Sequence, residues 1–246
     1  ASPKMRTAIF TNGIALNDRL IDSMSQCQFV SLSVNGLDEE TYRKVTGSSL
    51  FYKMQTNLKK LSRIRDKTFL CLRVLILPEN YTQIHGLCKW AKDIGLNAFN
   101  VRPVDFERSD IEGHRKLDLP VKFINEELER CHELAGENFR VYTVTHKFDP
   151  EFHVKHDFNK CLATPILLPI LQDGNGYLCV DKKMEENFRL GSCDPPENIL
   201  KWWGGDAHRE MIKSVNIDEC SRCTFSQYNI QMERAVKEDS MMVSFP

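Results

Sequence analysis

Short apolar runs alternate with amphipathic segments along the chain up to about residue 145. The apolar runs predict buried strands, over residues 6–12, 29–35, 68–77, 97–105 and 139–145. The segments between them carry apolar residues at helical spacing and predict helices, over residues 17–26, 39–45, 50–64, 80–95 and 119–136. Asn17 and Asp38 stand where helix-capping residues are expected. Because strands that alternate with helices form parallel sheets with right-handed crossovers, the pattern predicts an α/β fold.

The pattern changes near residue 150. Residues 166–181 read as a β-hairpin around the turn Asp173-Gly174-Asn175-Gly176. Helices are predicted over 195–203 and 206–215, and a polar helix follows Cys223 to about residue 238. The change predicts two domains, residues 1–148 and residues 149–246. The first is too short for a complete eight-fold barrel, which needs roughly 250 residues.

The amino-acid composition argues against some classes of binding partner. The chain has 246 residues, of which 41% are hydrophobic, and its net charge is −1. A balanced charge favours neither a nucleic-acid surface nor a membrane-binding face. No stretch approaches the roughly 18 apolar residues of a membrane-spanning helix. Nine cysteines without a secretory signal indicate reduced thiols and a cytoplasmic protein.

Five of the cysteines crowd the last third of the chain, and four of them form two spaced pairs. Cys161 and Cys179 bracket a glycine turn as C-x12-G-x4-C, and Cys220 and Cys223 form C-x-x-C. A C-x-x-C turn presents two thiolates on one side of a tight loop, and a hairpin can supply two more. Buried core thiols, a structural zinc and an iron–sulfur cluster all remain open on spacing alone. Cys193 reads as a thiol near the site.

The two cysteine pairs resemble the SPASM/twitch extension of radical S-adenosylmethionine (radical SAM) enzymes, in its shorter twitch form. The resemblance implies one auxiliary [4Fe–4S] cluster with Cys161, Cys179, Cys220 and Cys223 as ligands. Peptide NH groups around Gly174–Gly176 are then expected to donate hydrogen bonds to it. The first half agrees, because "FTNG", "VSLSVNG", "LRVLILPEN" and "NVRPVD" resemble successive strands of the radical SAM barrel, beginning at its third. The resemblance therefore implies a partial TIM-like barrel followed by a small α+β twitch domain with a β-hairpin.

The motif that defines the family, C-x-x-x-C-x-x-C, is absent from the 246 residues, as is a "GGEP"-like stretch. In the family that motif holds the [4Fe–4S] cluster that cleaves S-adenosylmethionine. Two explanations are open: the chain is the C-terminal portion of a longer enzyme, or it is a degenerate protein that has lost the chemistry. The first is favoured. On either explanation we expect this chain by itself to be inactive in cleaving S-adenosylmethionine.

The resemblance also suggests residues that bind S-adenosylmethionine. Ser33, at the end of the second predicted strand, matches a serine that bonds the ribose. Arg43 is the nearest cation to a position where the family places a carboxylate-binding arginine, although Thr46 occupies the position itself. Arg73 and Arg102 are charges inside apolar strands, so each is expected to bind a cofactor or substrate anion or to form an ion pair. Asn12 closes the first strand at the active-site end of a barrel.

These features together predict a radical SAM iron–sulfur oxidoreductase or maturase. The family reaction is hydrogen abstraction from substrate by a 5′-deoxyadenosyl radical. The expected partners are a small-molecule or peptide substrate and a reductant such as a flavodoxin or ferredoxin. The alternative is a non-catalytic interaction module that binds zinc or a cluster at the same four cysteines.

Overall fold

The structure is a computed structural model that describes residues 5–104, 119–145, 148, 156–220 and 223–236. The described residues fall into two compact units, one ending at Phe148 and the other beginning at His156. None of the described helices is both long enough and apolar enough to cross a membrane.

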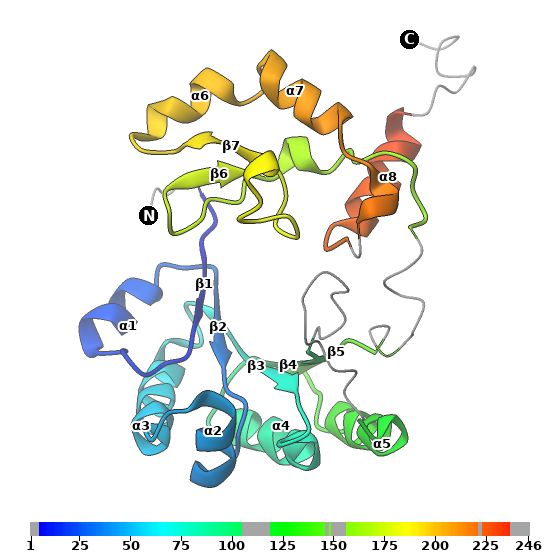
Figure 1. The fold of residues 1–246 in the computed structure, drawn as a ribbon. Helices are drawn as coiled ribbons and strands as arrows, with labels where there is room; N and C mark the ends of the chain where they lie inside the picture. Colours follow the sequence, from blue (N-terminus) through cyan, green and yellow to red (C-terminus); the bar gives the residue numbers. More distant parts are fainter. Residues whose placement is uncertain (1–4, 105–118, 146–147, 149–155, 221–222, 237–246) are drawn as a thin grey trace. The chain divides into compact units, whose positions relative to one another are not determined.

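Unit 1 contains a five-stranded parallel sheet in the order β1-β2-β3-β4-β5 (Figure 1). The strands are β1 (Ala8–Thr11), β2 (Phe29–Ser33), β3 (Phe69–Ile76), β4 (Ala98–Pro103) and β5 (Arg140–Thr143). All four strand pairings are parallel, so the predicted α/β fold with a parallel sheet is confirmed. Within the described residues β1 and β5 each pair with one strand only, and the sheet is open.

Five α-helices connect the strands and lie together on one side of the sheet (Figure 1). They are α1 (Asp18–Met24), α2 (Glu39–Thr46), α3 (Phe51–Leu61), α4 (Ile84–Asp93) and α5 (Val121–His132), with short 3-10 helices at η1 (Ser62–Ile64) and η2 (Tyr81–Gln83). The predicted caps are confirmed: the Asn17 side chain accepts a hydrogen bond from Leu20 N, and the Asp38 side chain accepts one from Thr41 N. Such caps satisfy peptide NH groups that a helix leaves free in its first turn.

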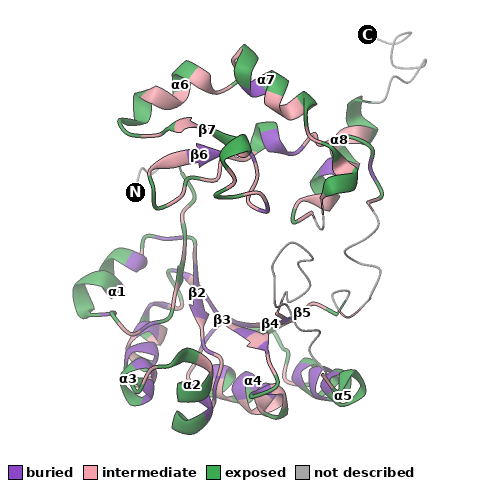
Figure 2. Ribbon diagram, viewed as in Figure 1, coloured by how far each residue is buried: buried purple, intermediate pink, exposed green. Residues whose placement is uncertain are grey.

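Alternation along the strands gives the sheet two different faces (Figure 2). Residues such as Leu32, Leu72 and Val101 are completely buried and join the helices in one hydrophobic core. The residues between them point to the opposite face, which is polar and aromatic rather than aliphatic. Burying a leucine of this kind contributes about 1.5–3 kcal/mol, so the helix-covered face holds unit 1 together. The opposite face is available for function.

Unit 2 contains two antiparallel strands, β6 (Asn175–Tyr177) and β7 (Arg189–Ser192). The predicted hairpin across the glycine turn forms, but it is short: Ile170 makes an antiparallel bridge with Gly176, Leu171 N donates to Asn175 O, and Tyr177 N donates to Pro169 O. The longer ladder of β6 is with β7, a pairing that the sequence did not predict. Pro169 lacks a peptide NH, which limits the first arm as a strand. The glycine turn itself forms, and Gly174 has a φ of 76°.

The helices of unit 2 lie close to their predicted positions. They are η4 (Thr164–Ile166), η5 (Glu186–Phe188), η6 (Pro196–Asn198), α6 (Ile199–Trp202), α7 (Asp206–Lys213), η7 (Ile217–Glu219) and α8 (Ser226–Val236). Trp202 lies on the two-stranded sheet and donates a hydrogen bond from Nε1 to Ser192 O at 3.2 Å. Glycine is required beneath it, because a Cβ at Gly176 or Gly191 would lie only 2.8 or 2.9 Å from the indole ring.

His208 links helix α7 to the turn before it. The ring is buried, stacks on Trp203 with 4.6 Å between ring centroids, and accepts a hydrogen bond at Nδ1 from Gly204 N. Burial lowers the pKa of His208 below its ordinary value of 6.5. Its stabilising contribution is therefore complete above pH 6.5 and is lost as the pH falls through the lowered pKa.

We expect the thermal stability of unit 2, followed by tryptophan fluorescence, to fall more steeply between pH 7.5 and 5.5 in the native chain than in a His208→Asn variant. Asparagine can accept the same hydrogen bond but does not titrate. An equal fall in both proteins would show that His208 does not control the acid response.

Candidate functional site

The four cysteines of the two spaced pairs line a single small cavity in unit 2. Cys161 lies just before η4, Cys179 follows β6, Cys220 follows η7, and Cys223 lies just before α8. Three segments that are distant in sequence, around Cys161, Cys179 and the C-x-x-C stretch at Cys220 and Cys223, therefore meet at one place. The rest of the wall is mostly apolar, from Phe158, Leu178, Phe188, Val215 and Ile217, with four polar residues, Thr164, Asp181, Lys182 and Asn229.

Peptide NH groups surround three of the four sulfurs. Asp181 N donates to Cys179 Sγ at 3.4 Å. The NH groups of Ala163 and Thr164 lower the pKa of Cys161, and that of Phe225 lowers the pKa of Cys223, although burial outweighs them at both thiols. Donors aimed at sulfur stabilise a thiolate and tune a metal bound to it.

Burial raises the pKa of all four thiols, to about 11 for Cys223. Neighbouring sulfurs act in the same direction, since Cys161 raises the pKa of both Cys179 and Cys220. Like charges that crowd one cavity disfavour ionisation unless a cation joins them. A metal centre at this site would therefore displace protons when it binds.

The four sulfurs share a cavity without converging on one point. Among the described residues, no group of three or more Cys, His, Asp or Glu side chains is close enough to hold a single metal ion.

Asn229, on helix α8, joins two of the cysteine-bearing segments. Its side chain is buried, with 1% of its surface exposed. Its Oδ1 accepts hydrogen bonds from Leu162 N at 2.6 Å and Ala163 N at 2.7 Å, directly after Cys161. Its Nδ2 donates to Cys223 Sγ at 3.4 Å. One amide therefore holds the Cys161 segment against the Cys223 sulfur.

Asp181 makes a second connection, two residues after Cys179. Its carboxylate accepts hydrogen bonds from Thr224 N at 2.6 Å and from Thr224 Oγ1 at 2.7 Å, directly after Cys223. His156 adds a third, because its Nε2 lies 2.8 Å from the carbonyl oxygen of Cys220. The sequence analysis missed all three residues, and no spacing or motif marks them.

The sequence predicts that the glycine turn and Cys193 both lie near the four cysteines. The peptide NH groups of the glycine turn are directed elsewhere: Gly174 N donates to Leu171 O, and Asn175 N donates to Asp173 Oδ1. The prediction that they serve the cysteine sulfurs is therefore wrong for these two groups. Cys193 is not among the residues that line the cavity and lies instead against Gly176.

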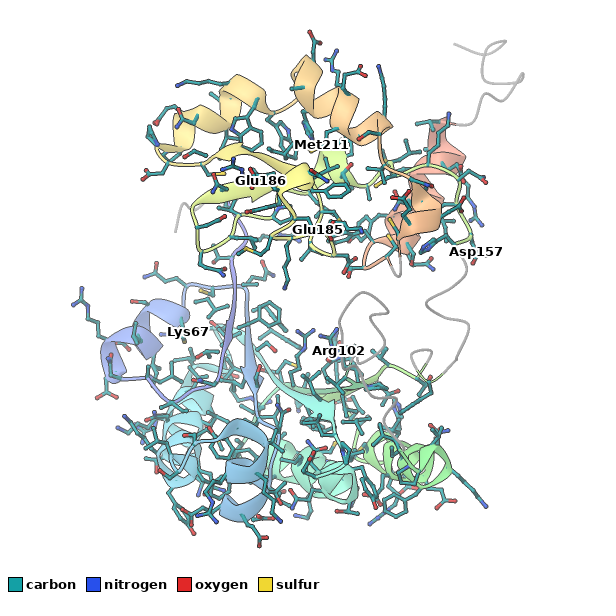
Figure 3. The ribbon with its side chains drawn as sticks, viewed as in Figure 1. Lys67, Arg102, Asp157, Glu185, Glu186 and Met211 are labelled. Carbon is teal, nitrogen blue, oxygen red and sulfur yellow. The ribbon has the colours of Figure 1, made fainter. Side chains whose placement is uncertain are left out.

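The predicted cofactor-binding residues lie mostly on the sheet of unit 1. Ser33 and Arg73 are register partners on the face opposite the helices, and Arg102 lies further along the same face. In Figure 3 the labelled Arg102 stands on the side of the sheet away from the helices. Asn12 follows β1, where its Oδ1 accepts a hydrogen bond from Ile14 N. Arg43 is separate from this group, exposed on helix α2.

Arg73 is a partly buried cation without a carboxylate partner among the described residues. Its Nε donates to Asn100 Oδ1 at 3.4 Å, and its guanidinium lies 4.9 Å from the ring centre of Phe10. Burial lowers the pKa of Arg73, and repulsion from Arg102 acts in the same direction. The buried Nε of Arg102 has no hydrogen-bond partner among the described residues.

No protein-family model and no curated protein matches this chain. Solved structures do resemble it. SuiB of Streptococcus suis is 16% identical with a TM-score of 0.62, over 87% of this chain and 52% of SuiB. SuiB bound to the precursor peptide SuiA is 15% identical with a TM-score of 0.60, over 86% of this chain and 50% of that one. The structure anSMEcpe with bound AdoMet is 19% identical with a TM-score of 0.52, over 96% of this chain and 68% of that one.

These likenesses show that the chain shares the fold of SuiB and of anSMEcpe over most of its length. At such low identity they show the fold alone. The chain spans about half the length of SuiB.

Proposed function

We propose that this chain is part of a radical SAM enzyme and that its second unit is a twitch-type domain with one auxiliary [4Fe–4S] cluster. The observation that carries the proposal is the convergence of Cys161, Cys179, Cys220 and Cys223 on one cavity. The spacing of these cysteines resembles the family pattern, and the radical SAM-like fold of the chain was found independently of it.

Four thiolates suit a zinc ion and an iron–sulfur cluster alike. The likeness of the cysteine spacing to the twitch pattern is what favours the cluster. A bound cluster would supply one-electron chemistry or a place to anchor the substrate.

The residues of unit 1 support a cofactor and substrate site on the open face of the sheet. Asn12 and Ser33 stand at the carboxyl ends of β1 and β2, where sites gather in barrels. We propose that they bind S-adenosylmethionine, and that Arg73 and Arg102 bind an anionic group of the cofactor or substrate. Arg43 is retained as a weaker proposal for the methionyl carboxylate, since it lies on an exposed helix.

For the complete protein we propose hydrogen abstraction from a small-molecule or peptide substrate by a 5′-deoxyadenosyl radical, with a flavodoxin or ferredoxin as reductant, in the cytoplasm. A peptide substrate gains support from SuiB, which has been solved with its precursor peptide. Cleavage of S-adenosylmethionine requires the C-x-x-x-C-x-x-C motif that this chain lacks, so we propose that the chain alone does not perform it.

The test is anaerobic reconstitution of the purified chain with iron and sulfide, followed by metal analysis and UV–visible spectroscopy. We expect about four irons and four sulfides per chain, the composition of one [4Fe–4S] cluster, and absorbance from thiolate–iron bonds. A chain that binds one zinc and shows no such absorbance would overturn the proposal. That result would instead favour the non-catalytic zinc-binding module.

A further inference from the structure

The face of the unit 1 sheet opposite the helices contains a pocket of about 490 Å³. Part of the pocket wall is formed by aromatic side chains. Phe29 and Phe69 are register partners on neighbouring strands, and their rings stack with 6.1 Å between centroids. Phe10 lies beside the lining residues, meets Phe29 edge-on at 6.0 Å and is 58% exposed. The partly exposed rings of Phe29 and Phe69 offer a surface on which an apolar group can pack.

Two guanidinium groups stand at the edge of this aromatic wall. Arg73 lies over the ring of Phe10 at 4.9 Å, and Arg140 lies over the ring of Phe69 at 6.0 Å. A cation–π contact of this kind uses none of the NH donors of the guanidinium. Within the part of the chain that the structure describes, the Arg73 guanidinium donates only from Nε, to Asn100. The remaining NH groups of Arg73 and Arg140 can therefore donate to a ligand in the pocket.

No acidic residue balances these charges on the described strands. The strand residues that point to this face include no Asp or Glu. A partly buried cation that lacks an anion is costly, so the face is complementary to a negatively charged ligand.

Ser31 provides an independent sign that the pocket accepts a polar group. It lines the pocket and has 1% of its surface exposed, yet its Oγ has no hydrogen-bond partner among the described residues. Buried hydroxyls are normally hydrogen-bonded. An oxygen atom of a bound ligand could accept a hydrogen bond from the Ser31 hydroxyl.

We infer that this pocket binds the carboxylate of an organic substrate that also carries an apolar group. A planar carboxylate can accept paired hydrogen bonds from a guanidinium edge, and the apolar group would lie on the rings of Phe29 and Phe69. The inference rests on the proposed function only in naming the ligand as the substrate. The carboxylate of S-adenosylmethionine has the same chemistry, so the test must separate the two.

The test is calorimetric titration of the 246-residue chain with N-acetyl-L-phenylalanine and with its neutral amide at pH 7.5. We expect the carboxylate to bind about tenfold more tightly or better, the difference that charge-assisted hydrogen bonds usually make. Arg73→Gln and Arg140→Gln should each remove about that advantage and leave binding of the amide unchanged. Arg63→Gln is the matched control, since Arg63 is exposed in η1 and contributes nothing to the pocket.

Equal affinity for the acid and the amide, no binding of either, or an equal loss in the Arg63 variant would overturn the inference. So would displacement of the probe by S-adenosylmethionine together with an equal loss of S-adenosylmethionine affinity in the Arg73 and Arg140 variants. If Arg73→Gln fails to fold by circular dichroism, the exposed Arg140 decides the result. The titration needs no cluster, so its outcome is separate from that of the iron and sulfide analysis.

Discussion

Replacing Cys179 or Cys220 with alanine is expected to reduce iron and sulfide in the reconstituted chain to the background level. Each substitution removes one of four thiols around a single cavity, one from each half of the site. The remaining wall is largely apolar and offers no comparable soft ligand, and iron–sulfur clusters depend on thiolate ligation. Iron and sulfide analysis of each variant, with the thiolate–iron absorbance, measures the loss.

Cys193→Ala is the matched control for these variants. It removes a thiol from the same unit, but Cys193 does not line the cavity. Its iron content should equal that of the native chain. Unchanged iron in Cys179→Ala or Cys220→Ala would contradict the assigned ligands, and loss of iron in Cys193→Ala would give that thiol a place among them.

Replacing Asn229 with alanine is expected to loosen the Cys161 segment even in the metal-free chain. The substitution leaves the peptide NH groups of Leu162 and Ala163 without their acceptor. An unsatisfied buried donor costs about 1–3 kcal/mol, so amide exchange at these two positions should accelerate about tenfold or more. Hydrogen exchange followed by NMR measures both amides directly.

Two further variants separate the roles of this side chain. Asn229→Asp keeps an acceptor for Leu162 and Ala163 but removes the NH donated to Cys223 Sγ, so exchange at the two amides should stay slow. Asn80→Ala is the control in unit 1. Asn80 is also fully buried and also accepts from a peptide NH, that of Leu77. The Asn80→Ala substitution should accelerate amide exchange at Leu77 and not at Leu162. An equal acceleration at Leu162 would mean that the effect of these substitutions is not local.

Most elements of unit 1 were predictable from sequence because two local signals agreed there. Apolar runs such as 68–77 became strands, and helices such as α2 began after a capping residue at Asp38. In unit 2 the sequence predicted the hairpin across the glycine turn, which forms as a short bridge at Ile170 and Gly176, but it missed the longer pairing of β6 with β7. β7 is a four-residue strand around Gly191 that carries little hydrophobic signal.

Some residues of the candidate site could also be predicted from the sequence, and others could not. The four cysteines of the cavity could be selected from the sequence because their spacing resembles a metal-ligand pattern. Asn229 and Asp181 leave no such pattern, because each acts on backbone groups of a distant segment, and an amide or carboxylate on a surface helix or loop looks the same in sequence. Arg73 and Arg102 were recognisable as charges in apolar strands, but Arg140 at the edge of a short strand was not.

By itself, the sequence determined the order of strands and helices, the class of the fold and the identity of four thiols suited to a metal, since each depends on residues close together in the chain or on a fixed spacing. Only the tertiary structure decided that these thiols share one cavity, that Asn229 and Asp181 join their segments, and that two arginines rest on aromatic rings beside an unpartnered serine. Those facts depend on contacts between segments that are far apart in sequence. The physical reason is that strand register and helix packing, which no short stretch encodes, set which side chains meet.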